Sequence, residues 1–289
     1  MFDEVRGTYA GFEVLEAWQT GQSDVRLVEL RNHRGEAIST AYVRRPLELN
    51  PDYYIILTYA GAKTGRKILG LIPERADLVL VSVQYPYESP RGALAFLRWP
   101  YDVRRAAFRT VAGGMLAVSF LDEEEQLDLD NLTVVGSSFG STFATIHGSL
   151  DDRVPVTLLI HGGGDLPLLV RTNVKQRWLA VPASLVAEIL VHSFDPIHYA
   201  DRIAPRKLVM ISSRNDSYFP VASAESLFTR ANEPKEIIWT ATPHVRSKKA
   251  DLVAEIVDQI EQYLAAQKQR AHEVRTLFGP SDHSGESIE

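Results

Sequence analysis

Six short runs of nearly continuous apolar residues recur along the chain, and they restrict its fold more than any other feature. The runs are residues 53–57, 78–83, 132–135, 156–160, 208–211 and 237–239. Strands that are apolar on both sides are buried on both faces, as in a parallel sheet covered by helices. The clearest of the intervening helices is 103–120, with Asp102 as its expected N-cap. The pattern therefore predicts an α/β protein.

Both ends of the chain add detail to this architecture. Residues 25–30 and 37–43 flank a polar stretch and are typical of an antiparallel hairpin. Near the other end, apolar residues between Leu252 and Leu264 recur at helical spacing and predict a last helix. We expect an α/β fold with a mostly parallel central sheet, an antiparallel hairpin at its N-terminus, helices on both faces and a small helical cap.

The length of 289 residues suits one large α/β domain, and no break in composition divides the chain. We predict a single domain over residues 1–274. Residues 166–204 carry apolar side chains at partly helical spacing and are expected to form the cap insertion. Residues 275–289 are mostly polar and are expected to be disordered.

Composition excludes several functional classes. The net charge of −6 leaves no basic surface for nucleic acid, and the absence of cysteine excludes thiolate catalysis, disulfides and cysteine-bound zinc. No stretch approaches the length of a membrane span, and the acidic start is unlike a secretory signal. The expected location is therefore the cytoplasm.

The sequence GSSFG at residues 136–140 places Ser138 between two glycines, after an apolar run and before a helix-like segment. A serine nucleophile must stand clear of the backbone and needs a base to take its proton. A tight turn between a strand and a helix exposes the serine, and it favours glycine where a Cβ atom would collide with a neighbouring element. Ser138 is the candidate nucleophile. The alternative is an ordinary glycine-rich turn without chemistry.

With this motif and the order of its strands, the chain resembles the α/β-hydrolases over roughly residues 25–265. Within that superfamily it is most similar to the dienelactone-hydrolase-like and acyl-peptidase-like branches. The resemblance implies a triad acid in the loop after the strand at 208–211, which falls on Asp216. Asp165, after the strand at 156–160, is the rival acid, and Asn215 is a weaker, uncharged substitute. Asp216 can also be interpreted as a turn or cap residue.

The resemblance also implies a base between the last strand and the last helix, which falls on His244. A neutral imidazole there is available at physiological pH, and the chain order Ser, Asp, His is that of the family. An exposed loop histidine is the alternative interpretation.

The expected oxyanion donors are the backbone N–H of Phe139 and a second donor from Gly61 or Ala62. Here the chain has Ala60 and Gly61 where the family often has a His-Gly pair, which leaves the second donor open. His161 opens an HGGG segment of the kind that forms oxyanion holes in lipases and esterases, where it precedes the nucleophile. Because it follows Ser138 here, we interpret it as lying outside the oxyanion hole, although its glycines could form a wall of the pocket.

We expect no cofactor and no metal site. His192 and His198 are six residues apart, which fits no zinc signature, and GAKTG at 61–65 lacks the spacing of a phosphate loop. The expected activity is a serine esterase that cleaves a small-molecule carboxylic ester through an acyl-enzyme. The alternatives are a peptidase or thioesterase with the same triad, and a non-catalytic binding protein of the same fold.

Overall fold

The computed structural model describes residues 2, 6–60, 65–86, 93–174, 176, 178, 180–182, 184–185, 191–244, 254, 257–260 and 262–266. The chain divides into two compact units, residues 1–245 and 246–289. In the second unit, every described residue is helical, in agreement with the predicted last helix. Residues 275–289 lie outside the described residues, and the predicted domain and cap boundaries stay predictions.

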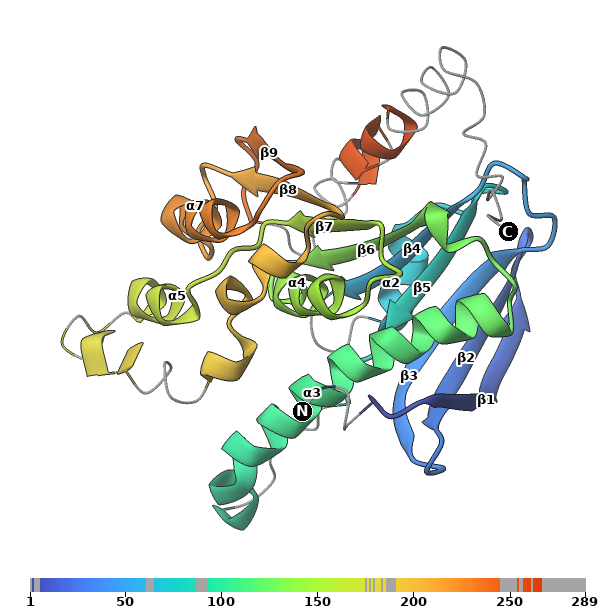
Figure 1. Cartoon of the computed structure of the whole chain (residues 1–289), viewed down its shortest axis with the longest axis horizontal. Helices are drawn as coiled ribbons and strands as arrows, with labels where there is room; N and C mark the ends of the chain where they lie inside the picture. Colours follow the sequence, from blue (N-terminus) through green and yellow to red (C-terminus); the bar gives the residue numbers. More distant parts are fainter. Residues whose placement is uncertain are drawn as a thin grey trace, which may run out of the picture. The chain divides into compact units, whose positions relative to one another are not determined.

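One mixed sheet of nine strands dominates the first unit (Figure 1). The strands are β1 (Tyr9–Gln19), β2 (Ser23–Asn32), β3 (Ala37–Pro46), β4 (Tyr54–Ala60), β5 (Leu78–Val83), β6 (Leu132–Ser137), β7 (Val156–Ile160), β8 (Lys207–Ser213) and β9 (Lys235–Thr240). Their spatial order is β1-β2-β3-β5-β4-β6-β7-β8-β9. Strands β1, β2 and β3 are antiparallel, β3 also pairs antiparallel with β5, and all pairs from β5 to β9 are parallel. The predicted fold class is confirmed.

The strand β1 is the main element that the sequence did not predict. It lies at one edge of the sheet, and most of its side chains are exposed or half-buried, including the apolar Val14 and Leu15. An edge strand that packs little against a core carries neither a continuous apolar run nor a clean alternation. Its partner β2 pairs in turn with β3, and β2 and β3 correspond to the predicted hairpin.

The helices are α2 (Gly65–Leu71), α3 (Ala93–Glu123), α4 (Gly140–Leu150), α5 (Leu166–Asn173) and α7 (Val221–Arg230). Short 3₁₀ helices are η1 (Leu129–Asn131), η2 (His192–Phe194), η3 (Pro196–His198) and η4 (Ala200–Arg202). Helix α3 begins ahead of the predicted start, so Asp102 lies inside the helix and the predicted N-cap is wrong. Pro100 and Asp102 together are typical of a helix start, but the helix runs through both.

The core lies between the sheet and helices α3 and α4, which pack against each other and against the strands (Figure 1). Because β6, β7 and β8 are parallel neighbours, the loops after them meet at one edge of the sheet. The loop after β9 joins them there. No helix among the described residues has the length and apolar character needed to cross a bilayer.

Candidate active site

Ser138 occupies a tight turn between β6 and α4. Its backbone has φ of 54°, in the left-handed region that non-glycine residues seldom adopt. The N–H of Ser138 donates to the carbonyl of Ile160 at 2.8 Å, which ties the turn to the end of β7. Strain of this kind persists where the surrounding structure enforces it, and it is frequent at active sites.

The two glycines of the turn are required by close packing. A Cβ atom on Gly136 would lie 2.6 Å from the Cβ of Ala144 in α4, and one on Gly140 would collide with the carbonyl of Tyr59 in β4. Any side chain at either position would push α4 away from the sheet. The turn therefore has the form that the sequence predicts for a nucleophile elbow.

His244 lies directly beside Ser138. Its Nε2 is 2.8 Å from Ser138 Oγ, and its Nδ1 is 2.7 Å from Asp216 Oδ2. The ring of Phe219 stacks on the imidazole at 6.0 Å between centroids and 12° between planes, and Tyr218 flanks it at 4.9 Å. His244 is only 7% exposed, so these neighbours hold the ring in place.

Asp216 is fixed at both of its oxygens. Oδ2 accepts from His244, while Oδ1 accepts from the backbone N–H groups of Tyr218 and Phe219 at 2.7 and 2.8 Å. Burial alone would raise the pKa of Asp216, but the hydrogen bonds from His244 and the two amides outweigh burial and lower it. An ionised Asp216 accepts a hydrogen bond from Nδ1–H of His244. In that tautomer Nε2 carries no proton, so it can accept the proton of the Ser138 hydroxyl.

The two rival groups have other partners. Asp165 is the N-cap of α5, where its Oδ1 accepts from the N–H of Leu168 at 3.0 Å. Asn215 donates from Nδ2 to the carbonyl of Ala241 at 3.0 Å. Among the described residues, Asp216 is the carboxylate that hydrogen-bonds His244.

His161 lies closer to these residues than its sequence position suggested. It follows β7 with φ of 49°, its side chain is buried, and its Nδ1 is 3.8 Å from Asp216 Oδ2. Its Nε2 is 3.2 Å from Thr242 Oγ1. Burial lowers the pKa of His161, against the opposing effect of Asp216. The signal for this placement was the parallel order of β7 and β8, because residues that end neighbouring parallel strands meet at one edge.

The glycines after His161 are packing spacers. A Cβ atom on Gly162 would collide with the side chain of Ser141 in α4, and one on Gly163 would collide with Ser223 in α7. The glycine-rich segment therefore lets the first turns of two helices approach the end of β7.

Phe139 is the N-cap residue of α4, so its backbone lies at the helix N-terminus directly after Ser138. Its ring is half exposed and contacts Phe143 edge-on at 5.3 Å. N–H groups at a helix N-terminus favour negative charge. Gly61 and Ala62, the predicted source of the second oxyanion donor, lie outside the described residues.

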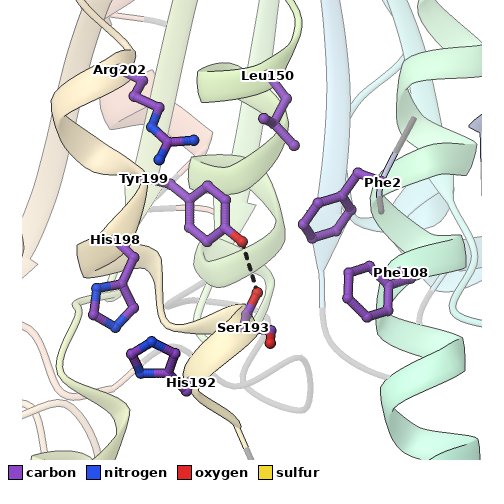
Figure 2. A pocket seen from close by; sticks show the side chains of 8 residues that line it. All are labelled: Phe2, Phe108, Leu150, His192, Ser193, His198, Tyr199 and Arg202. Atoms are coloured by element: carbon purple, nitrogen blue, oxygen red, sulfur yellow. Dashed lines mark hydrogen bonds between the residues drawn. The ribbon is translucent and has the colours of Figure 1, made fainter. Parts of the chain in front are cut away.

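His192 and His198 belong to a different place in the fold. Their rings lie 4.3 Å apart, and both line a cavity of about 390 Å³ together with Leu150, Tyr199 and two phenylalanines (Figure 2). Leu150 is the last residue of α4, whereas Ser138 precedes its first. This cavity therefore lies at the opposite end of α4 from the serine.

Comparison with known proteins identifies the fold. No protein-family model matches the chain, and no curated protein matches it. Solved structures do match. An acetyl xylan esterase from Paenibacillus sp. R4 superposes with a TM-score of 0.66 at 15% identity, over 92% of this chain and 90% of the other.

Two further structures agree. A cold-adapted esterase from an Arctic intertidal metagenomic library gives a TM-score of 0.56 at 14% identity, over 88% of this chain and 100% of the other. The α/β hydrolase GrgF from Penicillium sp. sh18 gives 0.54 at 13% identity, over 82% of this chain and 96% of the other. The chain has the α/β-hydrolase fold.

Proposed function

We propose that this protein is a serine hydrolase that cleaves carboxylic esters through an acyl-enzyme. The observation that carries the proposal is the continuous chain of hydrogen bonds from Ser138 through His244 to Asp216, with distances of 2.8 and 2.7 Å. A hydroxyl, an imidazole and a carboxylate in this order activate the hydroxyl as a nucleophile.

In the first half of the reaction, His244 Nε2 takes the proton of Ser138 as Oγ attacks the ester carbonyl. The imidazolium that forms is stabilised by ionised Asp216, which stays a carboxylate throughout. Negative charge develops on the former carbonyl oxygen, and the N–H of Phe139 is the first donor to it. The second donor is assigned to the Gly61–Ala62 segment, and a single donor of this kind contributes about 3–4 kcal/mol to the transition state.

In the second half, the intermediate collapses and His244 gives its proton to the departing alcohol oxygen. The acyl group is then carried by Ser138 Oγ. His244 next takes a proton from a water molecule as the water attacks the acyl carbon, and it returns that proton to Ser138 Oγ when the carboxylic acid leaves. His244 is neutral again once the alcohol has left and once more when the acid has left, so the protons balance over the whole reaction.

The substrate class is assigned from the superposed structures. Esterases recur among them, including the acetyl xylan esterase from Paenibacillus sp. R4 and the cold-adapted Arctic esterase. Those activities belong to those proteins, and they support an ester of a small or medium carboxylic acid as the substrate here. Thioesters and amides are cleaved by the same apparatus and serve as comparison substrates.

Active-site labelling tests the proposal. A fluorophosphonate probe is expected to label Ser138, as mapped by mass spectrometry of the digested protein. Turnover of p-nitrophenyl acetate and butyrate is expected to fall by at least about 10⁴-fold in Ser138→Ala. Ser137→Ala, which removes the adjacent hydroxyl, is the matched control and is expected to keep both labelling and turnover. Equal rates in the wild type and Ser138→Ala would reject the enzyme, and label on another residue would reject the site.

A further inference from the structure

Three side chains beside the serine form a set of metal-ligand type, which we call the histidine–aspartate cluster. Its members are His161, Asp216 and His244, and one ligand atom from each lies within 4.8 Å of the other two. They follow three neighbouring strands, β7, β8 and β9. His161 and Asp216 have side chains at most 1% exposed, and His244 is 7% exposed.

The spacing of the cluster is close to that of a bound ion. Bonds of about 2.1 Å in a tetrahedral site place ligand atoms about 3.4 Å apart. Asp216 Oδ2 is 2.7 Å from His244 Nδ1 and 3.8 Å from His161 Nδ1. Moving His244 Nδ1 away from Oδ2 and His161 Nδ1 towards it, each by less than about 1 Å, would bring both distances to about 3.4 Å. Two histidines and one carboxylate also form a common ligand set for divalent transition metals.

The outer contacts of the cluster suit a metal site as well. His161 Nε2 is 3.2 Å from the hydroxyl of Thr242, whose oxygen can accept a hydrogen bond from the imidazole. When Nε2–H of His161 is the donor in this contact, the deprotonated Nδ1 is the nitrogen on the side of Asp216. Metal-bound histidines usually donate their other N–H in this way, and the donor bond fixes the orientation of the ring. Asp216 Oδ1 is held separately by the amides of Tyr218 and Phe219, so Oδ2 is the oxygen that faces both imidazoles.

We propose that the histidine–aspartate cluster binds a zinc-class divalent cation, and that binding switches off the hydrolase. The inhibitory part of this inference rests on the proposed function. A cation bound to His244 Nδ1 takes the position of the proton shared with Asp216. The imidazole keeps one proton, which moves through solvent from Nδ1 to Nε2. Nε2–H then faces Ser138 Oγ and cannot accept its proton.

The donor atoms also define the selectivity of the site. Imidazole nitrogens suit zinc, cobalt, nickel and copper, whereas magnesium and calcium prefer sites built from oxygen alone. The chain has no cysteine to compete as a soft ligand. Zn²⁺ is therefore the probe, Co²⁺ its spectroscopic substitute, and Mg²⁺ the negative control.

Direct binding is measured without reference to turnover. Calorimetric titration of Zn²⁺ into the full chain carrying Ser138→Ala is expected to show one site at the cluster. Adding His161→Asn, in which asparagine tolerates the left-handed backbone, removes one ligand and is expected to weaken binding by at least about 100-fold. Thr242→Val keeps all three ligands and is expected to weaken binding by about 10-fold. Tetrahedral Co²⁺ absorption bands in the same proteins provide a second readout.

Inhibition is measured on the active protein with p-nitrophenyl acetate. Zn²⁺ is expected to inhibit and EDTA to restore turnover, while Mg²⁺ has no effect. For each variant we compare the rate in Zn²⁺ with the rate of the same variant without metal. This ratio is expected to be near one for His161→Asn.

A second pair of histidines provides the matched control. His192 and His198 lie side by side, with ring centroids 4.3 Å apart, at the cavity at the other end of α4 (Figure 2). The His192→Gln/His198→Gln double variant is expected to bind Zn²⁺ and to be inhibited like the wild type. Equal inhibition of wild type and His161→Asn, loss of binding in this double variant, or binding without inhibition would overturn the proposal. A protein that binds Zn²⁺ at the cluster but has no turnover would instead contradict the proposed function.

Discussion

Among the residues that the structure describes, two chains of hydroxyl, imidazole and carboxylate can be compared, and we expect the first of them to be the catalytic one. In the first, Ser138, His244 and Asp216 meet at the carboxyl edge of the sheet. In the second, Tyr59 Oη is 3.0 Å from His147 Nδ1, and His147 Nε2 is 3.5 Å from Asp151 Oδ2. The same three chemical groups thus occur in the same order in both places.

The two chains differ in whether a substrate can reach the hydroxyl. Ser138 is half-buried and stands on a strained turn, whereas Tyr59 and His147 are completely buried. Burial raises the pKa of Tyr59 well above its usual value, so its hydroxyl keeps its proton. A buried hydroxyl without room for a substrate beside it acts as a structural hydrogen-bonding group.

The charge beside each carboxylate also differs. Asp151 is held by the guanidinium of Arg153 through two bonds, at 2.8 and 2.7 Å. Asp216 is held by two backbone amides and faces two imidazoles. The guanidinium of Arg153, which is always charged, neutralises the charge of Asp151. The charge of Asp216 instead faces the imidazole of His244. Access to the hydroxyl and the absence of a guanidinium bond to the carboxylate therefore distinguish the proposed catalytic chain from the structural one.

The largest expected effect separates the proposed acid from its rival. Asp216→Asn preserves size but removes the charge and the correct His244 tautomer, so kcat is expected to fall by about 10⁴-fold. Asp165→Asn changes only the cap of α5 and is expected to leave kcat nearly unchanged. Steady-state kinetics on p-nitrophenyl acetate measures both. The reverse ranking would move the acid to the loop after β7.

The second prediction concerns the free energy of unfolding. Asp151→Asn breaks the ion pair between buried Asp151 and half-buried Arg153 and is expected to cost about 1.5–3 kcal/mol, with kcat nearly unchanged where the protein is folded. Asp152→Asn is the matched control, because its side chain is 96% exposed and its pairing with Arg206 contributes little. Denaturant unfolding at pH 7 measures both variants.

The same variant has a predicted pH dependence. Burial alone would raise the pKa of Asp151, but hydrogen bonds from Arg153 and His147 outweigh burial and hold it well below its usual range. A carboxylate with a depressed pKa in the folded state stabilises the protein above the unfolded pKa of about 4. That contribution is lost as the pH falls below this value. The stability gap between wild type and Asp151→Asn is therefore expected to be equal at pH 7 and 5 and to shrink at pH 3; a gap that widens in acid would contradict this explanation.

The smallest effect is expected from Tyr59→Phe. Loss of the hydroxyl leaves His147 Nδ1 without its partner and is expected to cost about 1–2 kcal/mol in unfolding free energy. Tyr199→Phe is the matched control, since its hydroxyl donates to the Ser193 carbonyl in a half-buried setting, and its cost is expected to be smaller (Figure 2). If Tyr59→Phe lost turnover but kept its stability, Tyr59, His147 and Asp151 would take part in the reaction. The distinction between a catalytic and a structural chain would then be wrong.

Much of the central sheet could be predicted from the sequence, because strands buried on both faces of a parallel sheet are continuous apolar runs. The runs at 78–83 and 156–160 coincide with β5 and β7. Ser138, Asp216 and His244 could be placed because each follows such a run, and the structure brings all three together. Their catalytic roles stay predictions.

Other parts carry no local signal. The edge strand β1 is too polar to stand out, and the start of α3 is concealed by Pro100 and Asp102. His161 looked remote because only the pairing of β7 with β8 brings it to Asp216. Contacts of this kind are a property of topology, and spacing along the chain does not encode them.

The three residues beside one another at the site come from distant parts of the chain. Ser138 precedes His244 by 106 residues and Asp216 precedes it by 28. His244 follows β9, which is the last strand among the described residues and forms an edge of the sheet. During synthesis the nucleophile is therefore made long before its base, and the serine has no partner until the final strand has joined the sheet. The proposed activity therefore requires synthesis of the chain at least as far as His244, and pairing of β9 with β8.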